Sequence, residues 1–336
     1  MRKELLLLAE LAVSLAIIAA VLYFVEIGKV VEVLSRADLS YAALALAVYA
    51  TINACMSYRI KIILAEMGYR IPLSRAMTAN LAGMLVSDFT PARSGYFATA
   101  FALTANEKIP LDCSVVSILG PQMFDFMVKV GAGTVAIIFI IHSLDLGIAG
   151  IGGMLLGVVA LASMLAFGVL LLFSKRFLAF LKIVERLPLC GKAYPAIVRM
   201  QENAVAVKKV MWTIAALLAL TWGLKGLEWY LLALSIGMRP DIGFHPFLFF
   251  LFLQPLITML QFIPTPTLAG MGLSEAGAVA VLALYGVSAP VAAAYAILTR
   301  SLMIVVDLAG VNEARKVVHD NLDAIFAGDF SGVDAD

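Results

Sequence analysis

Long apolar runs, separated by short polar breaks, extend along almost the whole chain. A helix needs about 20 consecutive apolar residues to cross a lipid bilayer. Six runs reach that length, at residues 5–25, 40–64, 111–141, 148–173, 211–236 and 288–311. No polar stretch between them is long enough to form a soluble domain. The pattern therefore predicts an all-α, polytopic integral membrane protein with about six spanning helices.

Two further apolar stretches contain residues that interrupt a helix. The interruptions are Asp88, Pro91, Arg93 and Gly95 within residues 76–104, and Pro264, Pro266, Gly270, Gly272 and Glu275 within residues 244–285. Proline and glycine end helices, and the backbone groups that they free cannot face lipid. We therefore expect each stretch to form a re-entrant hairpin whose turn contains these prolines and glycines. The alternative is a pair of ordinary spans with kinks.

The same order of elements occurs twice: span, span, hairpin, span. Each half would cross the membrane three times, so the second half would be inverted relative to the first. Two short motifs support a repeat, because T-P-x-x-x-G at 90–95 recurs at 265–270, and G-x-R at 68–70 recurs at 237–239. The tips of the two hairpins should then meet near the membrane midplane. Inverted repeats with broken helices are typical of transporters, and the positive N-terminus of a half-helix suits an anionic ligand.

The distribution of lysine and arginine predicts the orientation. With the N-terminus in the cytoplasm, 17 of the 24 basic residues lie on the inner side, three lie outside and four lie within apolar segments. The bias favours a multi-pass cell-membrane protein with both termini in the cytoplasm. We expect a first repeat at 1–142, an inverted repeat at 143–311 and a cytoplasmic tail at 312–336. The charged segment 175–209 would form amphipathic helices or a solvated loop on the cytoplasmic surface.

Four charged residues in the apolar spans have a partner at helical spacing. Asp125 and Lys129 are four residues apart, and Lys225 and Glu228 are three residues apart. Side chains at these separations share a helix face and can neutralise each other. The simplest interpretation is therefore local charge compensation within each helix.

Four other charges at membrane depth have no local partner: Asp88, Arg93, Glu275 and Arg300. A charge there is costly unless it is paired or hydrated. One interpretation is an ion pair between Arg93 and Glu275 that closes the site when it is empty. Another is that Arg93 and Arg300 bind a phosphate, since arginine is always charged and binds bidentately. Asp88 and Glu275 would carry protons if transport were proton-coupled.

Several other classes of function find no support in the sequence. A net charge of +1 gives no reason to expect a nucleic-acid partner. The sequence contains no GxxxxGK[ST] loop, no HExxH motif and no G-x-S-x-G motif. We therefore expect no ATP hydrolysis, no metal and no cofactor. An intramembrane lipid-modifying enzyme would depend on buried carboxylates alone, and we expect the chain not to be an enzyme.

Both predicted hairpins and one later segment carry a resemblance to a known family. The relevant parts are Asn80 through the PARSG turn at 91–95, the run PTPTLAGMGLSEAG at 264–277, and YAILTR ending at Arg300. The sequence resembles the flippase-like, lysylphosphatidylglycerol synthase transmembrane-region family. Many members carry Glu after the turn glycine and Arg three residues later, where this chain has Tyr96 and Thr99. It thus has fewer charges there for a headgroup.

The resemblance implies translocation of a lipid with a polar headgroup between leaflets. It also implies headgroup-binding roles for Arg93, Arg300, Glu275, Asp88 and Asn80. Longer members add a synthase or glycosyltransferase domain, so we expect this chain to supply only the translocation step, with a lipid-modifying enzyme as its partner. The lipid would be a phospholipid, an aminoacyl-lipid or a polyprenyl-phosphate-linked sugar. Two alternatives remain: a secondary transporter of a small polar solute, and a membrane partner subunit of a glycosyltransferase.

Overall fold

The computed structural model describes residues 27–144, 190–261 and 272–327, with a few isolated positions between 159 and 177. Every element in these three ranges is helical. Within these described ranges, four helices are long and apolar enough to cross a membrane: Leu39–Glu66, Leu111–Ile140, Met211–Ser235 and Ala289–His319. These correspond to four of the six predicted spans, and the all-helical prediction is confirmed. The predicted span 5–25 lies outside the described residues, as does nearly all of 148–173.

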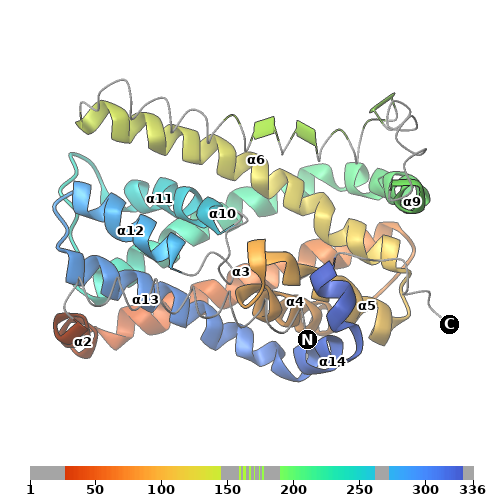
Figure 1. Ribbon diagram of the computed structural model, residues 1–336, viewed down its shortest axis with the longest axis horizontal. Helices are drawn as coiled ribbons and strands as arrows, with labels where there is room; N and C mark the ends of the chain where they lie inside the picture. Colours follow the sequence, from red (N-terminus) through yellow and green to blue (C-terminus); the bar gives the residue numbers. More distant parts are fainter. Residues whose placement is uncertain are drawn as a thin grey trace.

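The described helices fall into two groups along the chain. The first contains α2 (Ile27–Ser35), α3 (Leu39–Glu66), α4 (Leu73–Asp88), the 3-10 helix η1 (Pro91–Phe97), α5 (Ala98–Glu107) and α6 (Leu111–Leu144). The second contains α9 (Cys190–Lys209), α10 (Met211–Ser235), α11 (Pro246–Leu260), α12 (Leu273–Leu284), α13 (Ala289–Asp307), η4 (Leu308–Gly310) and α14 (Val311–Ala327). The long helices follow the long axis of the molecule (Figure 1). The figure shows α2, α11 and α12 toward one end and α5, α9 and α14 toward the other.

The long helices α3 and α10 end in the same way. Gly68 and Gly237 follow these helices with φ angles of +93° and +64°, which glycine adopts without steric cost. The next residue in each case, Tyr69 or Met238, donates its backbone N–H to a carbonyl five residues earlier, at 2.9 Å in both. This is the Schellman arrangement, which satisfies carbonyls at a helix end. The repeated G-x-R motif therefore marks the same local structure twice.

Each predicted hairpin returns the chain to the end where it started. At the mouth of the first, the Arg75 side chain at the start of α4 lies 3.5 Å from Glu107 at the end of α5. At the mouth of the second, Asp241, shortly before α11, donates its backbone N–H to the carbonyl of Tyr285, just after α12, at 2.8 Å. Both segments thus have hairpin geometry. Their re-entry into one side of a membrane stays a prediction.

The turns of the two hairpins are described to different extents. Pro91 begins η1, and the buried Gly95 donates its backbone N–H to Thr90 Oγ1 at 2.7 Å. Both residues therefore lie in the first turn, as expected. Gly272 precedes α12 with a φ of +89°, and its N–H donates to Glu275 Oε2 at 2.7 Å, which caps that helix. The other expected turn residues, Pro264, Pro266 and Gly270, lie outside the described residues.

Small residues bring the helices into close contact, as is common in membrane proteins. A Cβ added to Gly83 on α4 would lie 2.9 Å from the backbone nitrogen of Thr99 on α5. A Cβ added to Gly226 on α10 would lie 2.9 Å from the Cα of Leu251 on α11. Since real Cβ atoms almost never approach other atoms so closely, only glycine fits these two crossings.

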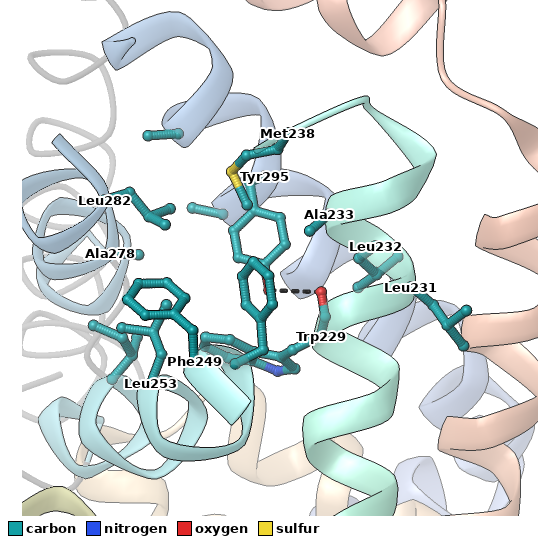
Figure 2. Close-up of a cluster of buried hydrophobic side chains, with 14 of the residues drawn as sticks. Trp229, Leu231, Leu232, Ala233, Met238, Phe249, Leu253, Ala278, Leu282 and Tyr295 are labelled. Atoms are coloured by element: carbon teal, nitrogen blue, oxygen red, sulfur yellow. Dashed lines mark hydrogen bonds between the residues drawn. The ribbon is translucent and has the colours of Figure 1, made fainter. Parts of the chain in front are cut away.

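The largest apolar core joins α3, α10, α11, α12 and α13. Figure 2 shows its centre, where the rings of Trp229, Phe249 and Tyr295 lie among Leu253, Leu282 and smaller side chains. The Tyr295 hydroxyl donates to the Trp229 carbonyl at 3.0 Å, so the one polar atom of that buried ring is satisfied. This core fixes α13 against α10 and thereby positions the charged residues that both helices carry.

The charged segments outside the spans are also helical where they are described. The end of the predicted segment 175–209 forms α9, which packs against α6 and contains four basic residues. Residues 312–327 of the predicted tail continue α14. The cytoplasmic placement of both segments stays a prediction, and so do the domain boundaries.

Candidate functional site

A cavity of about 290 Å³ opens between the two groups of helices. All four basic residues that the sequence places deep in apolar segments line it: Arg93 from η1, Lys129 from α6, Lys225 from α10 and Arg300 from α13. Three carboxylates also line it, those of Asp125, Glu228 and Glu275. Charges that are far apart in the sequence thus share one internal space.

Arg93 is held by partners from both hairpins. It forms an ion pair of 2.9 Å with the fully buried Asp88 and donates to Gln261 Oε1 at 2.9 Å. Ser87 Oγ accepts weaker bonds from the same guanidinium at 3.3 and 3.4 Å. The backbone φ of Arg93 is +57°, a region that L-residues rarely adopt. The turn therefore directs the guanidinium back toward the end of α4 and onto α11.

Arg300 is held in a similar way by the second hairpin. Its Nε donates to Glu275 Oε1 at 2.9 Å, and its Nη2 donates to Ser274 Oγ at 3.0 Å. Glu275 thus caps α12 and neutralises α13 at the same time. The expected ion pair between Arg93 and Glu275 is wrong, because each residue has a closer partner of opposite charge.

Lys129 and Lys225 share a single carboxylate. Asp125 lies 2.7 Å from Lys129 Nζ on its own helix and 3.3 Å from Lys225 Nζ on α10. The predicted compensation of Asp125 by Lys129 is therefore confirmed. No ion pair joins Lys225 to Glu228 among the described residues, because Lys225 is directed across the helix interface to Asp125.

Two buried carboxylates have few hydrogen-bond partners: Glu228, which lines the cavity, and Asp307. Glu228 on α10 is 2% exposed, and its Oε1 has no hydrogen-bond partner within the described part of the chain. Asp307 on α13 is fully buried and accepts a hydrogen bond of 3.0 Å from the Tyr49 hydroxyl. Its other oxygen has no partner among the described residues. Buried carboxyl groups with so few donors are unusual and indicate a functional role.

Two of the expected headgroup-binding residues lie behind the cavity wall. Asn80 is fully buried and donates to Asn53 at 3.0 Å, while its oxygen accepts a bond from the Tyr96 hydroxyl at 3.3 Å. Asp88 reaches the cavity only through Arg93. Tyr96 itself lines the cavity. Arg93, Arg300 and Glu275 line it, so the structure brings these three together as expected.

The sequence analysis missed one buried cation entirely. Arg59 on α3 counts as an inner-side charge by its place in the sequence, yet it is only 4% exposed. Its Nε and Nη1 atoms have no hydrogen-bond partner in the described residues. No acidic residue stands three or four positions from Arg59 in the sequence, and this lack of a partner on the adjacent helix turns was the available signal.

A second cavity of about 290 Å³ adjoins the first along α11. Its lining is apolar apart from one tyrosine and comes from α6, α11 and α12, with the loop residue Phe244. Leu256 lines this second cavity, whereas the next residue, Ile257, lines the charged one. A charged space and a hydrocarbon-like space are therefore separated by the width of one helix.

Comparisons with known proteins add one result. A family model described as the lysylphosphatidylglycerol synthase TM region matches residues 7–310. A search among curated proteins gives no match. The family match includes both hairpins and every residue that lines the charged cavity.

Proposed function

The chain belongs to the family of lysylphosphatidylglycerol synthase transmembrane regions, and from this membership and the charged cavity we propose a specific activity. It moves a lipid with an anionic or phosphate-linked headgroup between the two leaflets of the cell membrane without hydrolysing ATP. Membership in this family supports a function that involves membrane lipids. The cavity supports the choice of headgroup and the mode of action.

The observation that carries the proposal is the meeting of four basic side chains from four different elements in one cavity. Placing a charge at membrane depth is costly, so four in one place require a common reason. A phosphate group provides one, because lysine and arginine both bind phosphate through charge-assisted hydrogen bonds.

The two lysines are the proposed phosphate ligands. Arg93 and Arg300 each have a carboxylate of their own at 2.9 Å. Lys129 and Lys225 both form ion pairs with Asp125, so these three side chains together carry one positive charge. The lysine pair therefore retains a positive charge that an incoming phosphate would neutralise. Arg93 and Arg300 would contact the remaining polar part of the headgroup from the two hairpins.

The adjoining apolar cavity favours a lipid over a small solute. An amphiphile with its phosphate beside Lys129 would have its hydrocarbon chain within reach of the space lined by Val135, Phe139 and Leu256. A carrier of polar solutes has no use for such a space. Only the headgroup would pass through the protein, so its charge would never face bare hydrocarbon.

The mechanism that we propose is alternating access between two inverted repeats. The hairpin α4–α5 would enter from the cytoplasm and the hairpin α11–α12 from outside. Support comes from the identical ends of α3 and α10 and from the closed mouths of both hairpins. Each hairpin also packs against a long helix of the opposite group, α4 on α13 and α11 on α6. Small shifts of these contacts would open the cavity to one leaflet and then to the other.

The test is leaflet exchange in sealed vesicles that contain the purified protein. A labelled phosphatidylglycerol should exchange faster than in protein-free vesicles, with no ATP present. The variant Lys129→Gln with Lys225→Gln should lose most of this gain. Its matched control is Lys208→Gln with Lys209→Gln, which removes the same charge from the exposed surface of α9 and should exchange like the unmodified protein.

A broader panel of lipids distinguishes the proposed lipid translocation from the alternative functions. It should contain aminoacyl-lipids and polyprenyl phosphates besides phosphatidylglycerol. If none exchanges faster than in protein-free vesicles, the flippase proposal fails. The role of a membrane partner for a lipid-modifying enzyme would then be favoured. Uptake of a small polar anion without lipid exchange would instead favour a solute transporter.

A further inference from the structure

Arg59 on α3 is buried in a different setting from the four basic residues of the charged cavity. Each of those four lies within 3.3 Å of a carboxylate oxygen. Arg59 is only 4% exposed, and its Nε and Nη1 atoms are buried without a hydrogen-bond partner in the described part of the chain. No ion pair joins it to another described residue. Arg59 is therefore a buried cation with no counter-ion in contact among the described residues.

The helix register places Arg59 directly beyond the charged cavity. Tyr49, Ile52 and Met56 line this cavity from α3, and their spacing of three and four residues identifies one face of the helix. Arg59 follows Met56 by three residues on the same face, about 4.5 Å farther along the helix axis. It thus lies at the end of the cavity that points toward Glu66, the last residue of α3.

The neighbouring elements agree with this placement. Arg59 interacts electrostatically with Asp125 of α6 and with Tyr96 of η1, and both of these side chains line the charged cavity. One turn beyond Arg59, Ile63 belongs to an apolar core that includes Val207 of α9. Arg59 therefore lies between the charged cavity and the packed junction of α3 with α9.

The charge of Arg59 cannot be removed within the described protein. Asp125 is not a contacting counter-ion, because its two oxygens form ion pairs with Lys129 at 2.7 Å and with Lys225 at 3.3 Å. A guanidinium group also keeps its proton under all ordinary conditions. A buried charge without a partner lowers stability. A residue that breaks the rules of stable packing in this way indicates a functional site.

A phosphate group is the ligand that fits Arg59 best. The guanidinium donates parallel N–H bonds that match the oxygens of a phosphate, and the opposite charges strengthen them. A lipid phosphate that leaves Lys129 and Lys225 toward the α9 end of the molecule would reach Arg59 next. Adjacent sites of this kind ease passage, because neither has to bind the ion too tightly for it to leave.

We propose that Arg59 is a second phosphate-binding site, which receives the headgroup between the lysine pair and the end of the molecule where α9 lies. The identification of the phosphate as that of a lipid rests on the proposed function. The headgroup would bind the two sites in turn, in an order set by the direction of movement. The burial of Arg59 would keep this second site closed to water while it is empty.

The first measurement requires no ligand. Thermal unfolding of delipidated protein in a neutral detergent compares Arg59→Met with Arg70→Met, which replaces an exposed arginine just after α3. Arg59→Met should unfold at the temperature of the unmodified protein or higher, because it removes an unpaired buried charge and keeps an unbranched apolar side chain. Arg70→Met should show no change. A clear fall in Arg59→Met alone would mean that Arg59 has a structural partner, and would overturn the proposal.

The second measurement separates Arg59 from the lysine pair. It uses the triple variant Asp125→Asn, Lys129→Gln and Lys225→Gln, in which the other proposed phosphate ligands are neutral. Phosphatidylglycerol should still raise the unfolding temperature of this protein, because a bound ligand stabilises the folded state. Adding Arg59→Met should remove most of that rise, whereas adding Arg70→Met should not. Equal rises with and without Arg59 overturn the proposal.

Two further ligands identify what Arg59 recognises. Diacylglycerol, which lacks the phosphate, should show no dependence on Arg59. Inorganic phosphate at matched ionic strength should stabilise the protein much less than phosphatidylglycerol does, since it has no hydrocarbon chain to bind the apolar cavity. If inorganic phosphate alone shows the dependence on Arg59, the site takes a free anion and its assignment to a lipid is overturned.

The last measurement is phosphatidylglycerol exchange in sealed vesicles. Arg59→Met should slow exchange several-fold, and Arg59→Lys should slow it less, because lysine keeps the charge but not the planar fork. Arg70→Met should exchange like the unmodified protein. Unchanged exchange in Arg59→Met would exclude this residue from the path of the headgroup. If phosphatidylglycerol stabilises the protein through Arg59 but no lipid exchanges, the binding site stands and the proposed function fails.

Discussion

The two arginines of the cavity differ from its two lysines in how their charge is met. Arg93 and Arg300 come from opposite groups of helices, and each has its own carboxylate at 2.9 Å. Lys129 and Lys225 also come from opposite groups, but they divide one carboxylate between them. Each arginine region, Arg93 with Asp88 or Arg300 with Glu275, carries no net charge. The lysine region, Asp125 with Lys129 and Lys225, carries one net positive charge. The net charge of a group of ionised side chains therefore indicates where an anion binds better than the number of basic residues in the group does.

The largest effect should come from replacing all three charged residues of the lysine region, Asp125, Lys129 and Lys225, by neutral ones. The triple variant Asp125→Asn, Lys129→Gln and Lys225→Gln removes both lysines together with the carboxylate that they share, so none of these three charges is left unpaired and the protein should still fold. Its exchange of anionic lipid should fall at least about tenfold, because a charge about 4 Å from a phosphate contributes on the order of 4 kcal/mol at an effective dielectric constant of 20.

The matching change in an arginine region is Asp88→Asn with Arg93→Gln. It removes one charge of each sign and leaves the surplus at the lysines intact, so exchange should fall less than in the triple variant. Both are compared in the same vesicle assay after size-exclusion chromatography has shown folded protein. A larger loss in the arginine variant would reverse the comparison.

The second prediction concerns the stability of the two arginine pairs. Asp88→Asn should lower the free energy of unfolding by about 3 kcal/mol, because Arg93 loses a fully buried partner. Glu275→Gln should cost about half as much, since Glu275 is partly exposed and Arg300 keeps its bond to Ser274. Unfolding by denaturant in detergent micelles measures both. Equal losses of stability would show that the difference in burial does not determine the cost of breaking each ion pair.

A smaller loss of stability is expected from enlarging a glycine at the contact between α10, which carries Lys225, and α11. Gly226→Ala should cost about 1 to 3 kcal/mol, because the new methyl group would overlap Leu251 on α11. Gly223→Ala on the same helix meets no atom within 4 Å and is the control. It should be neutral or slightly stabilising, because alanine favours helix more than glycine does. Similar losses in the two variants would contradict the close approach of α10 and α11.

The smallest effect should be that of an exposed ion pair. Glu32 and Arg36 on α2 lie 2.8 Å apart, but both side chains are more than half exposed. Glu32→Gln should change stability by less than about 0.5 kcal/mol, because water screens such pairs. A loss as large as that of Asp88→Asn would mean that ion-pair geometry alone, rather than burial, determines the cost.

The sequence predicts the parts of this fold that depend on local pattern. Runs of about 20 apolar residues identify spans, and the prolines and glycines near residue 91 identify a break. The same-helix pair of Asp125 and Lys129 follows from a spacing of four residues. These features need only a few neighbouring residues, so the sequence is sufficient to find them.

The sequence does not predict contacts between distant segments. Lys225 reaches Asp125 across 100 positions, and Arg300 reaches Glu275 across 25. Helical spacing instead favours Glu228 as the partner of Lys225, and charge counting places Arg59 at the surface. Asp88 and Arg93 are five residues apart, which is not a helical spacing, and only the turn at η1 brings them together. Tertiary packing determines which of these residues pair, and helical spacing in a single sequence does not reveal that packing.

The most direct test of the central claim is an experimental structure of the protein in bilayer discs that contain phosphatidylglycerol. We expect density for a phosphate between the Nζ atoms of Lys129 and Lys225, with a hydrocarbon chain continuing toward the apolar cavity beside α11. Phosphate density against Arg93 or Arg300 alone, with the lysines still closed on Asp125, would contradict it. So would a cavity that is sealed from lipid on every side and contains only water.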